Sequence, residues 1–459
     1  MERLLPVPIS DYLNEDEKII ALFLARNGAA AKETDLAYGY RLRDLSFSLA
    51  IHAGLRYNVE KQKRSDDMLK SERKLIDWAI RRKDIIFFLI VTVFAIFARI
   101  SAFDYMTKDM ELCLLPWAER FREKGGFAAM QEQIGDYNIL YQTIIILLLK
   151  LPGSMMYLYK SVSVFFDFLL ALGCAWIIAR ETGERVFSAT FNIAYTFVIF
   201  LPTVVLNSAV WGQCDGMYGF LCVLALYTLY KEHYTVSFVA LGFALALKLQ
   251  AVFIVPVYLY FYICRKNFSL LSFLITLAVL WATGIPAYLQ GRPLTTVFDI
   301  YFLQMSEYSG MNFNGTTFWL LFFPDWQSMH NCAIVVTVLV LGLFLYRFLS
   351  KGLTLKTDFE SFLVAAAWSA WTCVLFLPGM HERYTYLADL LLVLLAVMSA
   401  KYRPYEALSV GISGITYTKL PGAVLLDRRC SVPFPGDCCA IPLLHLPQAS
   451  FLPDGCQVR

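Results

Sequence analysis

Charged residues are scarce in this chain of 459 residues, at 17% of the total, against about 25% in an average soluble globular protein. Hydrophobic residues reach 58%, which is typical of a polytopic membrane protein. The 40 basic and 37 acidic residues nearly cancel, leaving a net charge of only +3. This composition excludes nucleic acid as a partner and excludes a soluble enzyme held by one anchor.

The sequence also lacks the cysteine spacing of a zinc site and the long apolar run of a signal peptide. No pair of cysteines, and no cysteine with a histidine, has the spacing of a zinc site. Acidic residues from Asp11 onward interrupt the N-terminal segment, so we expect no cleavable signal peptide and predict that membrane insertion begins at a later helix. No ligand spacing demands a metal, and a divalent metal remains a candidate cofactor only because of the carboxylates described below.

The few charges are unevenly placed, and 30 of them lie before Ile85. We therefore divide the chain into a cytoplasmic polar head at 1–84, a membrane body at 85–403 and an atypical tail at 404–459. Met68 precedes the basic run before the first span and is an alternative start, which would make the head non-native. Residues 417–459 hold six of the 17 prolines and four of the 11 cysteines, which predicts either a frameshifted end or a disordered one.

The body predicts an all-α bundle of about ten transmembrane spans, because apolar runs of roughly 17 to 25 residues signal a span and shorter runs are compatible with tilted or re-entrant helices. Basic residues should gather in cytoplasmic loops, which fixes the direction of each span. On this basis the run at 137–151 lies on the outer surface, since Arg180 and Arg185 would otherwise fall outside. The predicted spans are 85–101, 155–178, 187–206, 216–230, 235–247, 251–263, 270–289, 333–345, 359–377 and 386–400.

The unusual polar residues of the body all fall on the outer side in this topology. Each has an ordinary explanation: a loop Asp is usually solvated, Lys248 is a possible snorkelling anchor, and Trp211 and Tyr384 are possible interfacial aromatics. Taken together they favour a cavity for a charged polar ligand, because ionisable groups at membrane depth usually mark function. The residues expected to line this cavity are Asp104, Asp109, Trp117, Trp211, Gln213, Asp215, Lys248, Gln250, His381, Glu382, Arg383 and Tyr384.

The residue types indicate glycosyl transfer from a lipid phosphate. A buried carboxylate such as Asp109 can take a proton from an alcohol. Lys248, Arg383 and His381 can hold a phosphate and offset the charge on a phosphate leaving group. Aromatic side chains offer apolar faces to a sugar ring, while amides and Asp215 can bind its hydroxyls.

Four stretches carry a resemblance to a known family: KDMELCLLPWAERFREKGGFAAMQEQIGDYNILYQ, VWGQCDGMY, KLQAVFIVPV and PGMHERYTY. Over residues 85–403 the chain resembles the bacterial integral-membrane glycosyltransferases of the GT-C class that are related to the mannosyltransferases of GPI-anchor synthesis. The resemblance implies a large first external loop with juxtamembrane helices, a polyprenyl-phosphate sugar donor and a first-loop Asp at the reaction centre. Asp109 is the best match for that Asp and Asp104 a competitor; the motifs also add Tyr137, Asn138 and Tyr218 to the expected substrate-binding set.

We therefore expect an inverting hexosyltransferase of the bacterial plasma membrane, with its site on the outer face. It would move a sugar, mannose or another hexose, to a lipid-linked or cell-surface glycan, with Asp109 as general base. A flippase for lipid-linked sugars is the rival class, although we see no internal repeat and the polar groups avoid the midplane. A glycan polymerase, whose donor would be a lipid-linked oligosaccharide, is the third alternative.

Overall fold

The computed structural model describes residues 70–307, 310–322, 325–350 and 358–426. The expectations for Met68 and for the Pro- and Cys-rich residues 427–459 lie outside these ranges. The chain divides into two compact units, Met1–Arg82 and Lys83–Arg459. In the first unit the described residues form helix α3, Lys70–Arg81. All the elements described below belong to the second unit.

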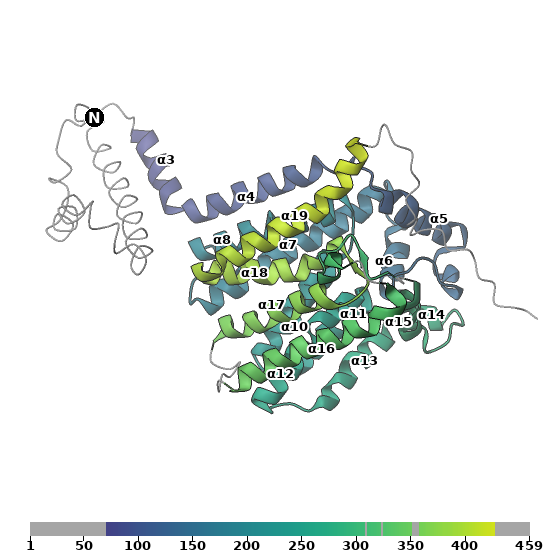
Figure 1. The fold of residues 1–459 in the computed structure, drawn as a ribbon. Coiled ribbons are helices and arrows are strands. Elements are labelled where there is room, and N and C mark those ends of the chain that lie inside the picture. The colour runs from purple at the N-terminus through teal and green to yellow at the C-terminus, as the bar shows by residue number, and fades with distance from the viewer. Residues whose placement is uncertain (1–69, 308–309, 323–324, 351–357, 427–459) are drawn as a thin grey trace, which may run out of the picture. The chain divides into compact units, whose positions relative to one another are not determined.

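Neighbouring apolar helices form the body of the second unit (Figure 1). Helix α7 packs against α8 and α10, α10 packs against α11, and α11 packs against α13. A further series, α17, α18 and α19, packs in chain order, and α18 also contacts α8. The predicted helical polytopic fold is confirmed. The bounds are α7 Met155–Glu181, α8 Ala189–Ile199, α10 Asp215–Tyr230, α11 Tyr234–Leu247, α13 Phe273–Ala282, α17 Phe359–Phe376, α18 Tyr386–Met398 and α19 Arg403–Leu426.

Few of these helices are long enough to span a membrane by themselves. Among the described residues α7, α17 and α16, Trp326–Ser350, have the necessary length and hydropathy. A fourth candidate joins α8 to the segment Pro202–Val210 with a bend of 52°, at a proline that cannot continue the hydrogen-bond ladder of α8. Length and composition alone thus support three or four of the ten predicted spans. Most of the others correspond to shorter apolar helices, among them α10, α11, α12 Val255–Arg265 with the preceding η6 Leu249–Ile254, and α13 with the preceding η7 Leu270–Ser272.

Short helices fill the segment between α4, Lys83–Ile100, and α7. The ten residues of α6, Ile139–Leu148, extend about 15 Å, half the thickness of a hydrocarbon core of about 30 Å. This helix is therefore too short to cross a membrane upright. The predicted first loop with helices of its own is present as η3 Met110–Leu114, α5 Leu115–Glu123, η4 Gly126–Gln131 and α6.

The long segment before α16 joins the segment before α18 through a two-residue parallel pairing. Strand β1, Asn312–Phe313, pairs with β2, Met380–His381, and Phe313 lies opposite His381. Trp319 adds a hydrogen bond from Nε1 to the carbonyl of Phe376, at 2.8 Å. The remaining elements are α14 Ile285–Tyr288, α15 Thr296–Glu307, η8 Phe318–Leu321, η9 Glu382–Thr385 and η10 Ala400–Tyr402.

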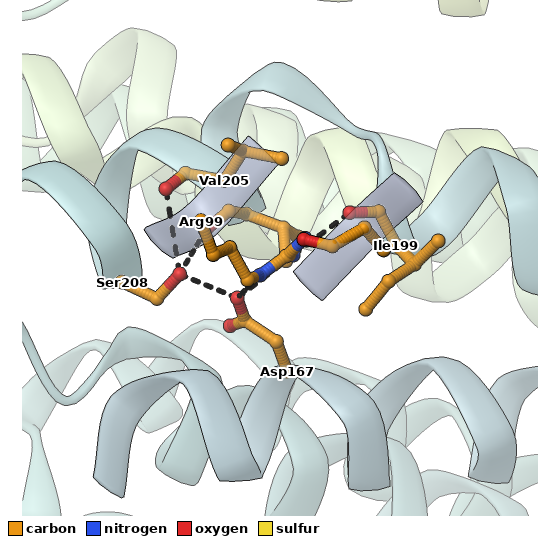
Figure 2. A network of polar contacts seen from close by, with 7 residues as sticks. Arg99, Asp167, Ile199, Val205 and Ser208 are labelled. Atoms are coloured by element: carbon orange, nitrogen blue, oxygen red, sulfur yellow. Dashed lines mark hydrogen bonds and ion pairs between the residues drawn. The ribbon is translucent and has the colours of Figure 1, made fainter. Parts of the chain in front are cut away.

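A buried ion pair joins α4 to α7, and both of its partners also bind the bent segment that leads into the polar site (Figure 2). Arg99 Nε lies 2.9 Å from Asp167 Oδ2, and Arg99 Nη2 donates to the carbonyl of Ile199 at 2.8 Å. Ser208 Oγ donates to the same carboxylate oxygen at 2.5 Å. Ile199 ends α8, whose last carbonyls lack helical partners. Arg99 thus supplies a donor at the break, and Ser208 fixes η5, Leu206–Val210, beyond the short α9, Pro202–Val205.

Candidate functional site

Lys160 holds the chain that leads from α4 to Asp109. Its ammonium group, on a fully buried side chain of α7, donates to the carbonyls of Ala102, Phe103 and Tyr105 at 3.1, 2.8 and 2.7 Å. A buried ammonium needs such acceptors, because an unpaired buried charge is very costly. The segment is therefore fixed on α7 just before Asp109, the residue that precedes η3.

Asp109 meets a cation and an amide from distant parts of the chain. Its Oδ2 lies 2.9 Å from Nη1 of Arg383, in η9, and accepts a hydrogen bond of 3.1 Å from Nε2 of Gln213. The side chain of Asp109 is 42% exposed, whereas that of Arg383 is 13% exposed. Both contacts fall on Oδ2, and no contact is assigned to Oδ1 among the described residues. Asp109, Gln213 and Arg383 thus bring together three of the four regions where the sequence predicts site residues. The fourth region is the segment around Lys248.

A glycine turn makes the contacts of Trp211 and Gln213 possible. Gly212 has φ +65°, and a Cβ atom there would lie 2.6 Å from Cε of Met110. The positive φ favours glycine here, and any other residue would also force the end of the Met110 side chain to move. On one side of it, the ring centroid of Trp211 lies 4.8 Å from the guanidinium carbon of Arg383, a cation–π contact. On the other, Gln213 is buried at 3% exposure and reaches Asp109.

Asp215 and Lys248 form a separate buried pair. Lys248 Nζ lies 2.6 Å from Asp215 Oδ1, and the side chains are 7% and 1% exposed. The ammonium group also lies 5.7 Å from the ring centroid of Tyr218. The charge of Lys248 is thus already balanced by Asp215, so a phosphate would have to share this ammonium group with a carboxylate.

Residues 381–383 contribute one cation, Arg383, and one neutral imidazole, His381. Burial, together with the positive charge of Arg383, lowers the pKa of His381 to about 3, so the imidazole is neutral at pH 7. Burial alone would lower the pKa of Arg383, but Asp109 and Glu382 outweigh it and raise the pKa above its usual value. Arg383 is therefore the charged group of this segment that suits a phosphate.

Aromatic rings pack behind these polar groups. The ring of His381 stacks on that of Phe313, with centroids 4.8 Å apart, and lies 5.2 Å from that of Tyr384. The ring of Trp117 meets that of Tyr137 edge-on at 5.8 Å. Trp117 and Tyr384 thus contact other site residues.

Two predicted site residues are occupied elsewhere. The carboxylate of Asp104 accepts a hydrogen bond of 2.6 Å from the hydroxyl of Tyr157, at an exposed position. Asn138 caps α6, accepting from the amide of Ile139 at 2.8 Å and donating to the carbonyl of Val297 at 2.8 Å. Their expected roles in substrate binding therefore remain predictions, and the geometry favours Asp109 over Asp104 as the reactive carboxylate.

Several residues that support the site were not predicted from the sequence. Lys160 lies inside a predicted span, where any ionisable residue is a candidate for function or structure, so its position was a usable signal. Phe313 carries no such signal, because its importance depends on stacking with His381, a residue distant in sequence. Among the described residues, no group of three or more His, Cys, Asp or Glu side chains is arranged to hold a metal ion.

Comparison with known protein families gives a match to the middle of the chain. The model of glycosyltransferase family 87 matches residues 139–304. The match supports a membrane glycosyltransferase family for this chain, as the sequence resemblance implies at this coarser level. It covers Gln213, Asp215 and Lys248, but neither Asp109 nor Arg383. No curated protein shows a significant match to the chain.

Proposed function

We propose that the protein transfers a sugar, mannose or another hexose, from a polyprenyl phosphate to a hydroxyl of a lipid-linked or cell-surface glycan. One observation carries the proposal: Asp109 and Arg383 meet at 2.9 Å, with the carboxylate partly exposed and the cation largely buried. A base beside a phosphate-binding cation is what glycosyl transfer from a phosphate requires. The match to glycosyltransferase family 87 supports the same reaction class.

Asp109 has a suitable geometry for the base. Because Arg383 and Gln213 both contact Oδ2, the other oxygen is the natural acceptor for the proton of the attacking hydroxyl. As that proton moves to Asp109, the acceptor oxygen bonds to the anomeric carbon and the bond from that carbon to the phosphate oxygen breaks. The electron pair leaves with the polyprenyl phosphate, and this single displacement inverts the anomeric configuration.

Arg383 is our candidate for the phosphate contact. Its guanidinium presents several donors and binds phosphate well in two-point geometry. It would offset the negative charge that develops on the phosphate oxygen as the glycosidic bond breaks. Lys248 would assist only by sharing its ammonium group with Asp215, while neutral His381 would offer a hydrogen bond rather than charge.

Unpaired buried acceptors favour a ligand rich in hydroxyl groups. Oδ2 of Asp215 and Oε1 of Gln250 are buried and have no hydrogen-bond partner among the described residues. Each unsatisfied buried acceptor costs about 1 to 3 kcal/mol. The hydroxyl groups of a sugar could donate to both, and binding would then recover part of that cost.

Membranes containing the full chain, and matched membranes lacking it, test the proposal directly. Both are incubated with a panel of polyprenyl phosphates carrying different radiolabelled hexoses, and labelled glycan products are separated and their anomeric configuration determined. We expect one donor to give a chain-dependent product of inverted configuration. Label that changes sides of the membrane without a new glycosidic bond would instead indicate a flippase and contradict the proposal.

A further inference from the structure

We propose that Tyr137 is a positioning residue for Asp109 and acts through the amide of Gln213. The inference rests on the proposed function in assigning Asp109 as the base. The hydroxyl of Tyr137 lies 2.5 Å from Oε1 of Gln213, and Nε2 of the same amide lies 3.1 Å from Oδ2 of Asp109. The three side chains thus form a continuous hydrogen-bonded chain.

The chemistry of the end groups fixes the direction of every hydrogen bond in this chain. An ionised carboxylate only accepts hydrogen bonds, so the amide must present its NH₂ group to Asp109. Its carbonyl oxygen then faces Tyr137, whose hydroxyl must donate. Burial raises the pKa of Tyr137 well above its usual value, which keeps that hydrogen in place. Without the hydroxyl of Tyr137, the carbonyl oxygen of Gln213 would lose this donor, and the amide would be held by its contact with Asp109 alone.

Tyr137 itself is firmly held. Its backbone carbonyl accepts hydrogen bonds from Nε2 of Gln133 at 3.0 Å and from Nε2 of Gln142 at 2.8 Å. Its ring packs between Trp117 and Tyr141, with centroid distances of 5.8 and 4.6 Å. The tyrosine is therefore a fixed reference against which the Gln213 amide is oriented.

Arg292, in the segment after α14, also supports Tyr137 through Gln133. Nη1 of Arg292 donates to Oε1 of Gln133 at 3.0 Å, and Gln142 donates to the same oxygen at 3.0 Å. Arg292 thereby connects that segment to the chain of contacts that ends at Asp109. The consequence is a carboxylate whose Oδ2 is fixed by Gln213 and Arg383, so that Oδ1 points reproducibly to the acceptor hydroxyl.

The substitution Tyr137→Phe tests this role because it removes the hydroxyl and keeps the ring. We expect kcat to fall about tenfold, the effect of one hydrogen bond that orients a reacting group, while KM for the donor stays within about twofold. Tyr141→Phe is the matched control: Tyr141 is an adjacent buried tyrosine whose hydroxyl makes no hydrogen bond that is assigned among the described residues. It should leave both constants unchanged. An unchanged kcat in Tyr137→Phe, or a change confined to KM, would overturn the proposal.

A double-mutant cycle with Gln213→Leu separates positioning from a direct effect. If Tyr137 acts through Gln213, Tyr137→Phe should cause no further loss of kcat once Gln213 is leucine. A further tenfold loss in that background would show that Tyr137 acts independently and would contradict the relay.

The melting temperature of the purified full chain gives the same cycle without any substrate. We expect Tyr137→Phe to lower it in the wild-type background but not in the Gln213→Leu background, where the hydroxyl has already lost its partner. Equal decreases in both backgrounds would overturn the relay. If the wild-type chain transfers no sugar, the proposed function fails, and this second cycle still decides whether the relay exists.

Discussion

Asp109 and Asp104 show how the same residue type acquires different roles within one short segment. Asp109 contacts Arg383 and Gln213, whereas Asp104 contacts the exposed hydroxyl of Tyr157. A carboxylate beside a buried cation, in a partly exposed position, has a counter-ion and can still reach a substrate. Residue type and loop position predict both as candidates, and only the partners distinguish them.

The lowered pKa of His381 predicts how the stability of the folded protein depends on pH. This pKa is lowered to about 3 in the folded protein, from about 6.5 when unfolded. Protonation therefore favours the unfolded state, so the stability that His381 supports is present above pH 6.5 and is lost as pH falls towards 3. The loss reaches about 1.4 kcal/mol per pH unit for one proton.

Comparing the wild type with His381→Gln isolates this effect from other titrating groups. We expect the melting temperature of the wild type to decrease more than that of the variant between pH 7.5 and pH 4.5. Parallel decreases over this range would show that His381 titrates normally in the folded protein.

At the scale of helices, the sequence predicts the elements better than their ends or their contacts. Apolar runs correctly locate α7, α10, α11 and α17, because burial in lipid or core requires such runs. The run at 187–206 predicts one span, and the structure adds a bend of 52° at Pro202 that the apolar pattern does not indicate. The pairing of Lys248 with Asp215 could not be predicted, since a sequence does not give the distance between helix ends.

The ion pair that ties α4 to α7 leads to a stability prediction. Removing one partner of a buried pair leaves an uncompensated charge and costs about 3 to 5 kcal/mol. We therefore expect Arg99→Met, which leaves Asp167 alone and removes the donor to Ile199, to lower the melting temperature strongly (Figure 2). The double variant Arg99→Met/Asp167→Leu should recover much of the loss. A double variant as unstable as Arg99→Met would argue that the pair itself is not the source of the effect.

At the scale of the whole membrane unit, helix α10 separates the polar site from a basic turn. Asp215 is its first residue, and Lys231, which follows its last residue, lies 2.6 Å from Glu181 at the end of α7. The 16 residues of α10 extend about 24 Å, which is about four-fifths of a hydrocarbon core of about 30 Å. Basic residues favour the cytoplasmic side, so this arrangement favours a site on the outer face.

Cysteine labelling in intact cells tests that orientation. We expect Lys108→Cys, an exposed position one residue before Asp109, to add labelling by a membrane-impermeant maleimide above the wild-type background. Lys266→Cys, an exposed position at the end of α12, should add labelling only after the cells are permeabilised. The opposite pattern would place the site on the cytoplasmic face.

Two isosteric substitutions test whether Asp109 is the base of a glycosyl transfer. Membranes containing Asp109→Asn, Asp104→Asn or the wild type are supplied with the active polyprenyl-phosphate sugar, with chain levels matched. We predict that Asp109→Asn reduces product formation at least about 100-fold, as expected for loss of a general base, while Asp104→Asn stays within about threefold of the wild type. Full activity in Asp109→Asn, or the larger loss in Asp104→Asn, would contradict the account.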